Sequence, residues 1–149
     1  MPCRYLIDKE RRLVISRGWD RVTFDEMKAH ETQLKSDPDF NPEYNQLLDA
    51  TKVTVLELSI DEAKTMAGRT IFAPGSRRAW VATDPAIYGM GRLMATYHEM
   101  GKMPTQVCVF YDLRCALEWL GLEALPDAIK PEEAKKVKAA TPAKNNKIA

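Results

Sequence analysis

The chain has 149 residues, of which 45% are hydrophobic, so its size and composition suit one globular domain with its own core. The formal net charge is +1, but residues 130–149 carry six lysines and two glutamates, which leaves −3 on residues 1–129. A mildly acidic body argues against a nucleic-acid surface, where clustered basic side chains are expected. We interpret the arginine pairs at 11–12 and 77–78 as solvated charges at a turn and at the start of a strand.

No apolar run approaches the roughly 18 residues that a membrane-spanning helix needs, so we expect no transmembrane segment. Charged residues come too early in positions 1–12 for a secretory signal. Cys3, Cys108 and Cys115 have no metal-ligand spacing and cannot all pair within one chain. We therefore expect a cytoplasmic protein with reduced thiols, no metal and no cofactor.

The first elements in chain order are two short strands at residues 5–8 and 13–16, with a polar turn between them. This arrangement predicts a hairpin, and Gly18 is expected to close the second strand. Thr23 followed by Glu26 has the spacing of a capping box, which predicts the start of a helix.

The Asp-Pro pair at 37–38 is expected to end that helix, and residues 46–49 then form a short buried strand. Ser59 and Glu62 make a second capping box, which opens a helix that residues 73–76 (APGS) are expected to stop.

A fourth strand is predicted at residues 78–83 and a fifth at 107–110. Asp84 is expected to cap the helix between them, with Pro85 at its favoured first position, and Asp112 to cap the last helix. Strands that alternate with helices predict a largely parallel sheet, to which the first strand is added in antiparallel orientation at one edge.

The composition changes near residue 126 to lysine, alanine, proline and asparagine. Such a segment buries too little apolar surface to offset the entropy of ordering it. We therefore divide the chain into an α/β domain at 1–126 and a flexible tail at 127–149.

Four segments carry a resemblance to a known family: residues 4–16 (RYLIDKERRLVIS), 37–51 (DPDFNPEYNQLLDAT), 82–94 (ATDPAIYGMGRLM) and 109–122 (VFYDLRCALEWLGL). Together they make the chain from about residue 3 to 125 resemble the SpoIIAA-like bacterial proteins of the STAS type, whose fold is similar to that of the CRAL-TRIO lipid-transfer domains. The resemblance implies an α/β SpoIIAA-like (STAS) fold, with a mostly parallel five-stranded sheet, an antiparallel edge strand and about four flanking helices. The biochemical role of that family is largely unassigned, so the resemblance implies a fold more than a function.

The same resemblance places Ser59 where anti-sigma factor antagonists carry a serine that a partner kinase phosphorylates. Three departures surround it, because Glu57, Leu58 and Ile60 replace the aspartate, serine and glycine of that turn. Acidic neighbours would also repel a phosphate. Two interpretations stand, a phosphorylation site or a helix cap, and we favour the cap.

The third helix contains Gly89 and Gly91, each of which costs roughly 1 kcal/mol relative to alanine, so a neighbour is expected to approach closely. That neighbour could be the sheet or another helix, or else a ligand or a second copy of the chain. The methionines and aromatic residues nearby indicate either core and subunit interface, which we favour, or an apolar pocket for a lipid-like molecule. The candidate ligand or interface residues are Trp80, Thr83, Asp84, Tyr88, Gly89, Met90, Gly91, Met94 and Tyr97.

A ligand of a parallel sheet is expected beyond the carboxyl ends of the strands, where Asp49, Asp84 and Asp112 would disfavour an anion. His30 and His98 lie on different helices, and the sequence does not bring them together. Catalysis would require titratable groups to converge, for example His98 with Asp84 or Asp112. We identify no catalytic residues.

We therefore predict a non-enzymatic protein-interaction or regulatory module of the STAS-like type, which contacts its partner through the surface formed by the second and third helices. We expect a homodimer with an unidentified protein partner. The first alternative is a carrier or sensor of a small apolar ligand, and the second is a phosphoserine partner-switch protein that uses Ser59.

Overall fold

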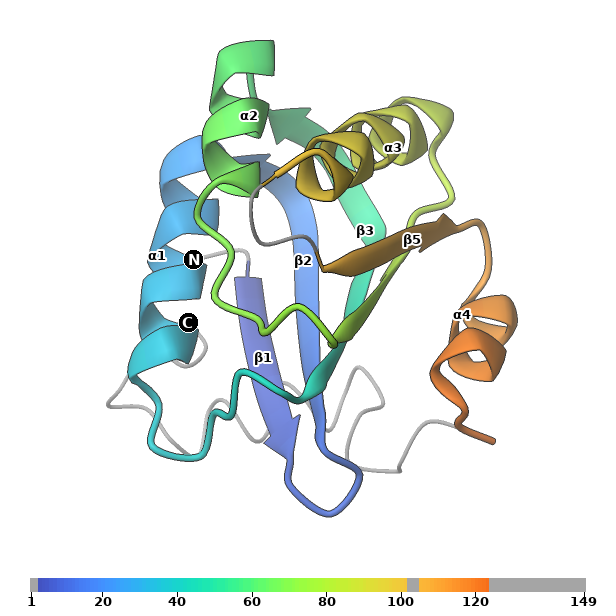
Figure 1. Cartoon of the computed structure of the whole chain (residues 1–149). Helices are drawn as coiled ribbons and strands as arrows, with labels where there is room; N and C mark the ends of the chain where they lie inside the picture. Colours follow the sequence, from blue (N-terminus) through green and yellow to red (C-terminus); the bar gives the residue numbers. More distant parts are fainter. Residues whose placement is uncertain (1–2, 102–104, 124–149) are drawn as a thin grey trace.

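A computed structural model describes residues 3–101 and 105–123 (Figure 1). The elements in chain order are β1 (Cys3–Asp8), β2 (Leu13–Thr23), α1 (Phe24–Ser36), β3 (Asn45–Glu57), α2 (Ile60–Ala67), β4 (Arg77–Val81), α3 (Pro85–Glu99), β5 (Gln106–Phe110) and α4 (Leu113–Leu120). One five-stranded sheet has the order β1-β2-β3-β4-β5. β1 is antiparallel to β2, and the other neighbouring pairs are parallel, as the alternation of strands and helices predicted.

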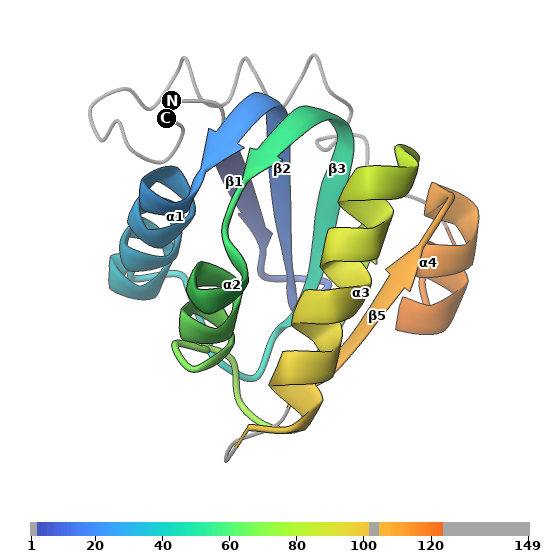
Figure 2. The same ribbon diagram turned by 90° about the horizontal axis from the view of Figure 1, so that it is seen from above.

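The helices divide unequally between the two faces of the sheet. Figure 2 shows α1, α2 and α3 along one face and α4 apart from them, beside β5. On the α4 face, apolar side chains of β2, β3 and β4 pack against those of the helix. The strands contribute Leu13, Ile15, Leu47, Ala79 and Val81, and α4 contributes Ala116, Leu117 and Leu120. The residues that alternate with these along each strand point to the opposite face of the sheet, beneath α1, α2 and α3.

The prediction that β2 ends at Gly18 and β3 at Asp49 was wrong. β2 continues to Thr23 and β3 to Glu57, and the two extensions pair with each other. The register shifts on both sides of Trp19, and Asp20 takes a left-handed conformation with φ 57°. These irregularities obscure the alternation of apolar and polar residues from which a strand is predicted.

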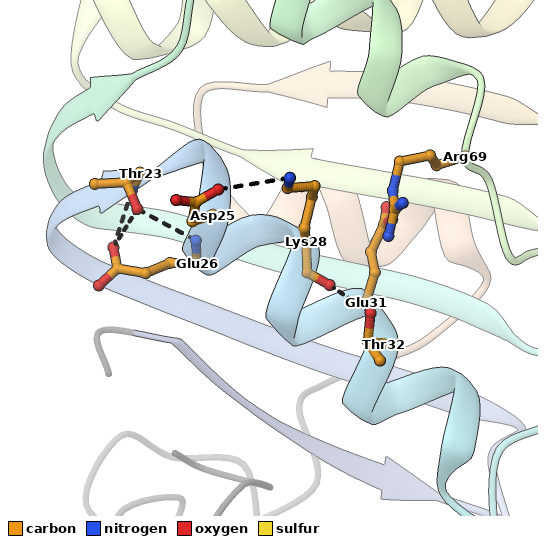
Figure 3. A network of polar contacts seen from close by, with 7 residues as sticks. All are labelled: Thr23, Asp25, Glu26, Lys28, Glu31, Thr32 and Arg69. Carbon is orange, nitrogen blue, oxygen red and sulfur yellow. Dashed lines mark hydrogen bonds and ion pairs between the residues drawn. The ribbon is translucent and has the colours of Figure 1, made fainter.

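The predicted helix starts are confirmed. Thr23 Oγ1 accepts from the Glu26 backbone N–H at 3.2 Å, and Glu26 Oε1 accepts from the Thr23 backbone N–H at 2.9 Å (Figure 3). Asp84 and Asp112 cap α3 and α4, and Pro85 occupies the first turn of α3. α2 ends at Ala67, earlier than residues 73–76, and a loop continues to β4.

Two expectations concern residues outside the described ranges, the tail at 127–149 and its boundary at 126. Within the ranges that the structure describes, no helix is long and apolar enough to cross a membrane.

Candidate functional site

A cavity of about 130 Å³ lies between the sheet and the helices α1, α2 and α3. Its wall is mostly apolar and includes Val53 of β3, Met66 of α2, and Ile87 and Met94 of α3. The cavity therefore lies within the larger layer, is partly open, and extends toward the carboxyl ends of the strands, where Val22, Leu56 and Ala82 line it.

Small residues in the sheet leave the space for this cavity. The register pairs Ser16 with Leu48 and Leu48 with Trp80. One position further along the same face, β2 and β3 supply Gly18 and Ala50, and Ala82 follows β4 directly. All three line the cavity, so the floor lacks large side chains where the helices pass over it.

Polar residues gather at the other end of the cavity, near the starts of the strands. Gln46 of β3 pairs in register with Arg78 of β4, and Ser16 lies one row further along. α1 contributes His30 and Glu31, and α3 contributes His98. The cavity is consequently amphipathic, with a polar end near Arg78 and an apolar end near Ala50 and Ala82.

A hydrogen-bond network connects four of these side chains. Gln46 Oε1 accepts from Arg78 Nε at 3.0 Å and from Trp80 Nε1 at 3.4 Å. Gln46 Nε2 donates to Ser16 Oγ at 3.2 Å, and Ser16 Oγ lies 3.0 Å from His30 Nε2. Ser16 Oγ can accept from Gln46 and still share a second hydrogen bond with His30, whose direction depends on the tautomer of the imidazole ring.

Arg78 is the charged residue at the centre of this end, and it is only 6% exposed. Its guanidinium lies over the ring of Phe72 at 4.6 Å and that of Trp80 at 5.5 Å. Nε is bonded to Gln46, but Nη1 is buried without a hydrogen-bond partner. No described carboxylate lies within ion-pair distance of Arg78. Burial lowers the Arg78 pKa to about 10, so the group remains a cation at neutral pH.

The two histidines stay neutral in this environment. Burial, and then the charge of Arg78, lower the pKa of His30 to about 4 and that of His98 to about 3. The ring of His30 meets Tyr5 edge-on at 5.6 Å, and that of His98 meets Trp80 edge-on at 5.8 Å. Each ring can therefore supply a hydrogen bond without adding a charge.

Glu31 is the acidic residue on the cavity wall. Its side chain points toward Arg69, whose Nε lies 3.4 Å from Glu31 Oε1 (Figure 3). Burial raises the Glu31 pKa to about 7, although the charges of Arg78 and Arg69 oppose that shift. Near neutral pH the carboxyl is thus divided between its two protonation states.

The predicted ligand or interface residues divide into two groups. Trp80, Gly91 and Met94 line the cavity. A Cβ added at Gly91 would lie 3.4 Å from Val109 Cγ1, so the sheet is the close neighbour there, whereas Gly89 has nothing within 4 Å. Six predicted residues are not part of the wall: Thr83, Asp84, Tyr88, Gly89, Met90 and Tyr97.

Several of those residues have other contacts. Asp84 caps α3, and the Tyr88 ring stacks on that of Tyr111 with centroids 3.8 Å apart. Ser59 caps α2: its Oγ accepts from the Glu62 backbone N–H at 3.1 Å, and Glu62 Oε1 accepts from the Ser59 backbone N–H at 2.9 Å.

The interpretation of Arg78 as a solvated charge was wrong, because this side chain is buried. Arg77 beside it is exposed, as expected. The alternation of side chains along a strand could have separated the two arginines, because residues two positions apart point to the same face. Arg78 lies on the same face of β4 as the buried Trp80, and Gln46 lies on the same face of β3 as Leu48. The convergence of His30 with His98 was also missed, since it depends on how two helices are placed. His98 and Asp84 lie at opposite ends of α3.

The chain resembles a known protein in its fold but not in its sequence. No protein-family model matches the chain, and no curated protein sequence matches it. A solved structure from Shewanella loihica PV-4, an uncharacterised DUF3478-family protein with a SpoIIAA-like fold, superposes with a TM-score of 0.54 at 18% identity. The match covers 79% of this chain and 93% of that one.

The fold is SpoIIAA-like. This agrees with the resemblance noted in the sequence and with the mixed sheet and its four flanking helices. At this level of identity the SpoIIAA-like fold carries no function with it. The cavity and its side chains therefore have to supply the functional argument.

Proposed function

We propose that this protein is a binding module that encloses a small molecule in the cavity beneath α1, α2 and α3. The observation that carries this proposal is the space above Gly18, Ala50 and Ala82, which is walled by apolar side chains and closed at one end by polar ones. Concave, mostly apolar sites with a few convergent polar groups are typical of ligand pockets.

The volume limits the size of the ligand. An engineered apolar cavity of roughly 150 Å³ binds benzene, whereas pockets for drug-sized ligands have roughly 300–1,000 Å³. The cavity of about 130 Å³ therefore suits a ligand of one ring or a short branched chain. A long acyl chain, as in a lipid carrier, would require the helices to move apart.

A titration of isotope-labelled protein with toluene, followed by NMR, tests this proposal. We expect shifts of the amides around Ala82 and Gly91 that saturate with toluene concentration. Ala50→Leu, which fills the cavity, should abolish them, and Ala79→Leu, on the face covered by α4, serves as the matched control. Shifts confined to surface residues, or unaffected by Ala50→Leu, would refute the proposal.

A protein-interaction or regulatory role is the second candidate. Large apolar side chains are exposed on or beside the helices α2 and α3, with Ile60 56% and Met100 75% exposed. Such side chains can contribute to a contact with a partner protein or a second copy. Sedimentation of the wild type and of Ile60→Asp tests it: a dimer lost in the variant supports a self-contact, and a monomer in both excludes one.

A further inference from the structure

We infer that the ligand of this cavity is a small organic monoanion, a carboxylic acid whose carboxylate pairs with Arg78 while its apolar body lies over Ala50 and Ala82. The inference rests on the proposed function, because it assigns a chemical class to the molecule that the cavity encloses. It differs from the sequence-based expectation of an apolar ligand, and it follows from the one arginine on the cavity wall that is almost fully buried.

First, without a ligand, Arg78 is a buried cation with few partners. Arg78 is only 6% exposed, and it has no ion-pair partner among the described residues. Its one described hydrogen bond uses Nε, and Nη1 is buried without an acceptor. The charge of Glu31 acts on Arg78 only from beyond ion-pair distance. A buried cation without a direct partner is costly, so an anion bound at Nη1 would be stabilised.

The second step is the orientation of the guanidinium. Gln46 fixes Nε at 3.0 Å, and the amide of Gln46 is itself held by Trp80 and Ser16. Phe72 lies over the guanidinium at 4.6 Å. A guanidinium held in this way is preorganised for the two oxygens of a carboxylate, which it can bind with parallel hydrogen bonds.

The third step is the selection of one negative charge. Arg78 supplies one cation with no carboxylate within ion-pair distance among the described residues, and Glu31, whose charge acts on it from further away, is paired with Arg69 at 3.4 Å. His30 and His98 are neutral and can donate or accept a hydrogen bond at the polar end. A dianion such as a phosphate ester would carry a second charge with no cation to neutralise it. A monocarboxylate matches the charge of the site.

The fourth step is the match of shape and polarity. The polar end of the cavity is near the starts of β3 and β4, and the apolar end extends toward Ala50, Ala82 and Ile87. A ligand with one carboxylate and one ring or short branched chain fits this gradient. Benzoate is a suitable probe, because nitrobenzene has nearly the same shape and no charge.

Calorimetric titrations of the full chain with benzoate and with nitrobenzene test the inference. We expect benzoate to bind about tenfold more tightly or better, since charge-assisted hydrogen bonds are the stronger kind. Arg78→Met should remove that preference and leave nitrobenzene binding in place. Arg78→Lys retains the charge and should keep part of the preference, provided that circular dichroism shows both variants folded.

The outcomes distinguish the inference from the proposed function. Equal affinity for the two probes, or a benzoate preference that survives in Arg78→Met, overturns the inference and leaves the binding module standing. Failure of both probes to bind the wild type overturns the proposed function and the inference with it.

Discussion

Arg78 and Gln46 stand side by side on adjacent parallel strands, and their side chains are joined by a hydrogen bond of 3.0 Å from Nε to Oε1. The bond orders a buried guanidinium but does not neutralise it. Nη1 of the same guanidinium is buried without a hydrogen-bond partner, and a buried polar group without a partner is costly. The proposal of a carboxylate ligand depends on this pair.

The first prediction concerns the stability cost of that charge. Arg78→Met should raise the free energy of unfolding by about 1–3 kcal/mol, because it replaces a buried cation that has no ion-pair partner among the described residues by an apolar side chain of similar length. Urea denaturation at pH 7 measures this change. A large loss of stability instead would mean that Arg78 serves mainly as a structural residue.

The second prediction concerns the cavity as empty space. Ala50→Leu should raise the free energy of unfolding by about 1 kcal/mol, because it fills space that no side chain occupies. Ala79→Leu should lower it by about 1–3 kcal/mol, because Ala79 is fully buried in the packed layer against α4. Equal destabilisation by the two variants in thermal denaturation would show that the space above Ala50 is already filled.

The third prediction concerns Ser59 as a helix cap. Ser59→Ala should lower the free energy of unfolding by about 1 kcal/mol, while Ser59→Asn, another good cap, should lower it much less. Chemical denaturation of the two variants makes the comparison. If both variants have wild-type stability, the capping bonds of Ser59 are not important for the fold, and a signalling role becomes the better explanation of this serine.

The fourth prediction concerns pH. A histidine in the unfolded chain binds a proton near its ordinary pKa of about 6.5, whereas His30 and His98 in the folded protein do so only at about 4 and about 3. Below pH 6.5 the unfolded state therefore holds more protons, and the free energy of unfolding falls as the solution becomes more acidic. This loss continues down to the folded pKa values.

Glu31 acts in the opposite direction. Its pKa is raised to about 7 in the fold, so the folded state keeps a proton that the unfolded state loses, and stability falls as the pH rises from 4.5 to 7. Two histidines outweigh this one carboxyl group below pH 6.5. Among these three groups, the net effect of acidification is therefore destabilising.

His98→Gln isolates one of these contributions. Between about pH 4.5 and 6 the variant should lose stability on acidification less steeply than the wild type, by about 1.4 kcal/mol per pH unit, which corresponds to one proton. Urea denaturation across that range gives both slopes. Parallel slopes would show that His98 is already protonated in the folded protein.

The sequence predicted the features that local chemistry determines. Thr23 and Ser59 each precede a glutamate by three residues, and each caps a helix in the structure. The parallel pairing of β2 to β5 followed from the alternation of strands and helices. The ends of β2 and β3 were not predicted, because the register of their paired extensions is irregular and because the extensions contain charged residues. Arg21 and Glu57 are examples, with Arg21 Nη1 3.0 Å from Glu57 Oε2.

The site could be predicted only in part. Gly91 was identified because glycines inside a helix indicate a close neighbour, and Met94 and Trp80 because methionines and aromatic residues gather near it. The polar end was missed because Ser16, Gln46, Arg78, His30 and His98 come from five separate elements. Their convergence depends on strand register and helix placement, which no single stretch of sequence encodes.

The most direct test of the account is an isotope-filtered NOE measurement on labelled protein saturated with benzoate. We predict NOEs from the benzoate ring protons to the methyl groups of Ala50, Ala82 and Ile87, and none to the methyl group of Ala79. Ring protons that contact only surface methyl groups, or no methyl group at all, would contradict the claim that this SpoIIAA-like domain encloses a small acid beneath its helices.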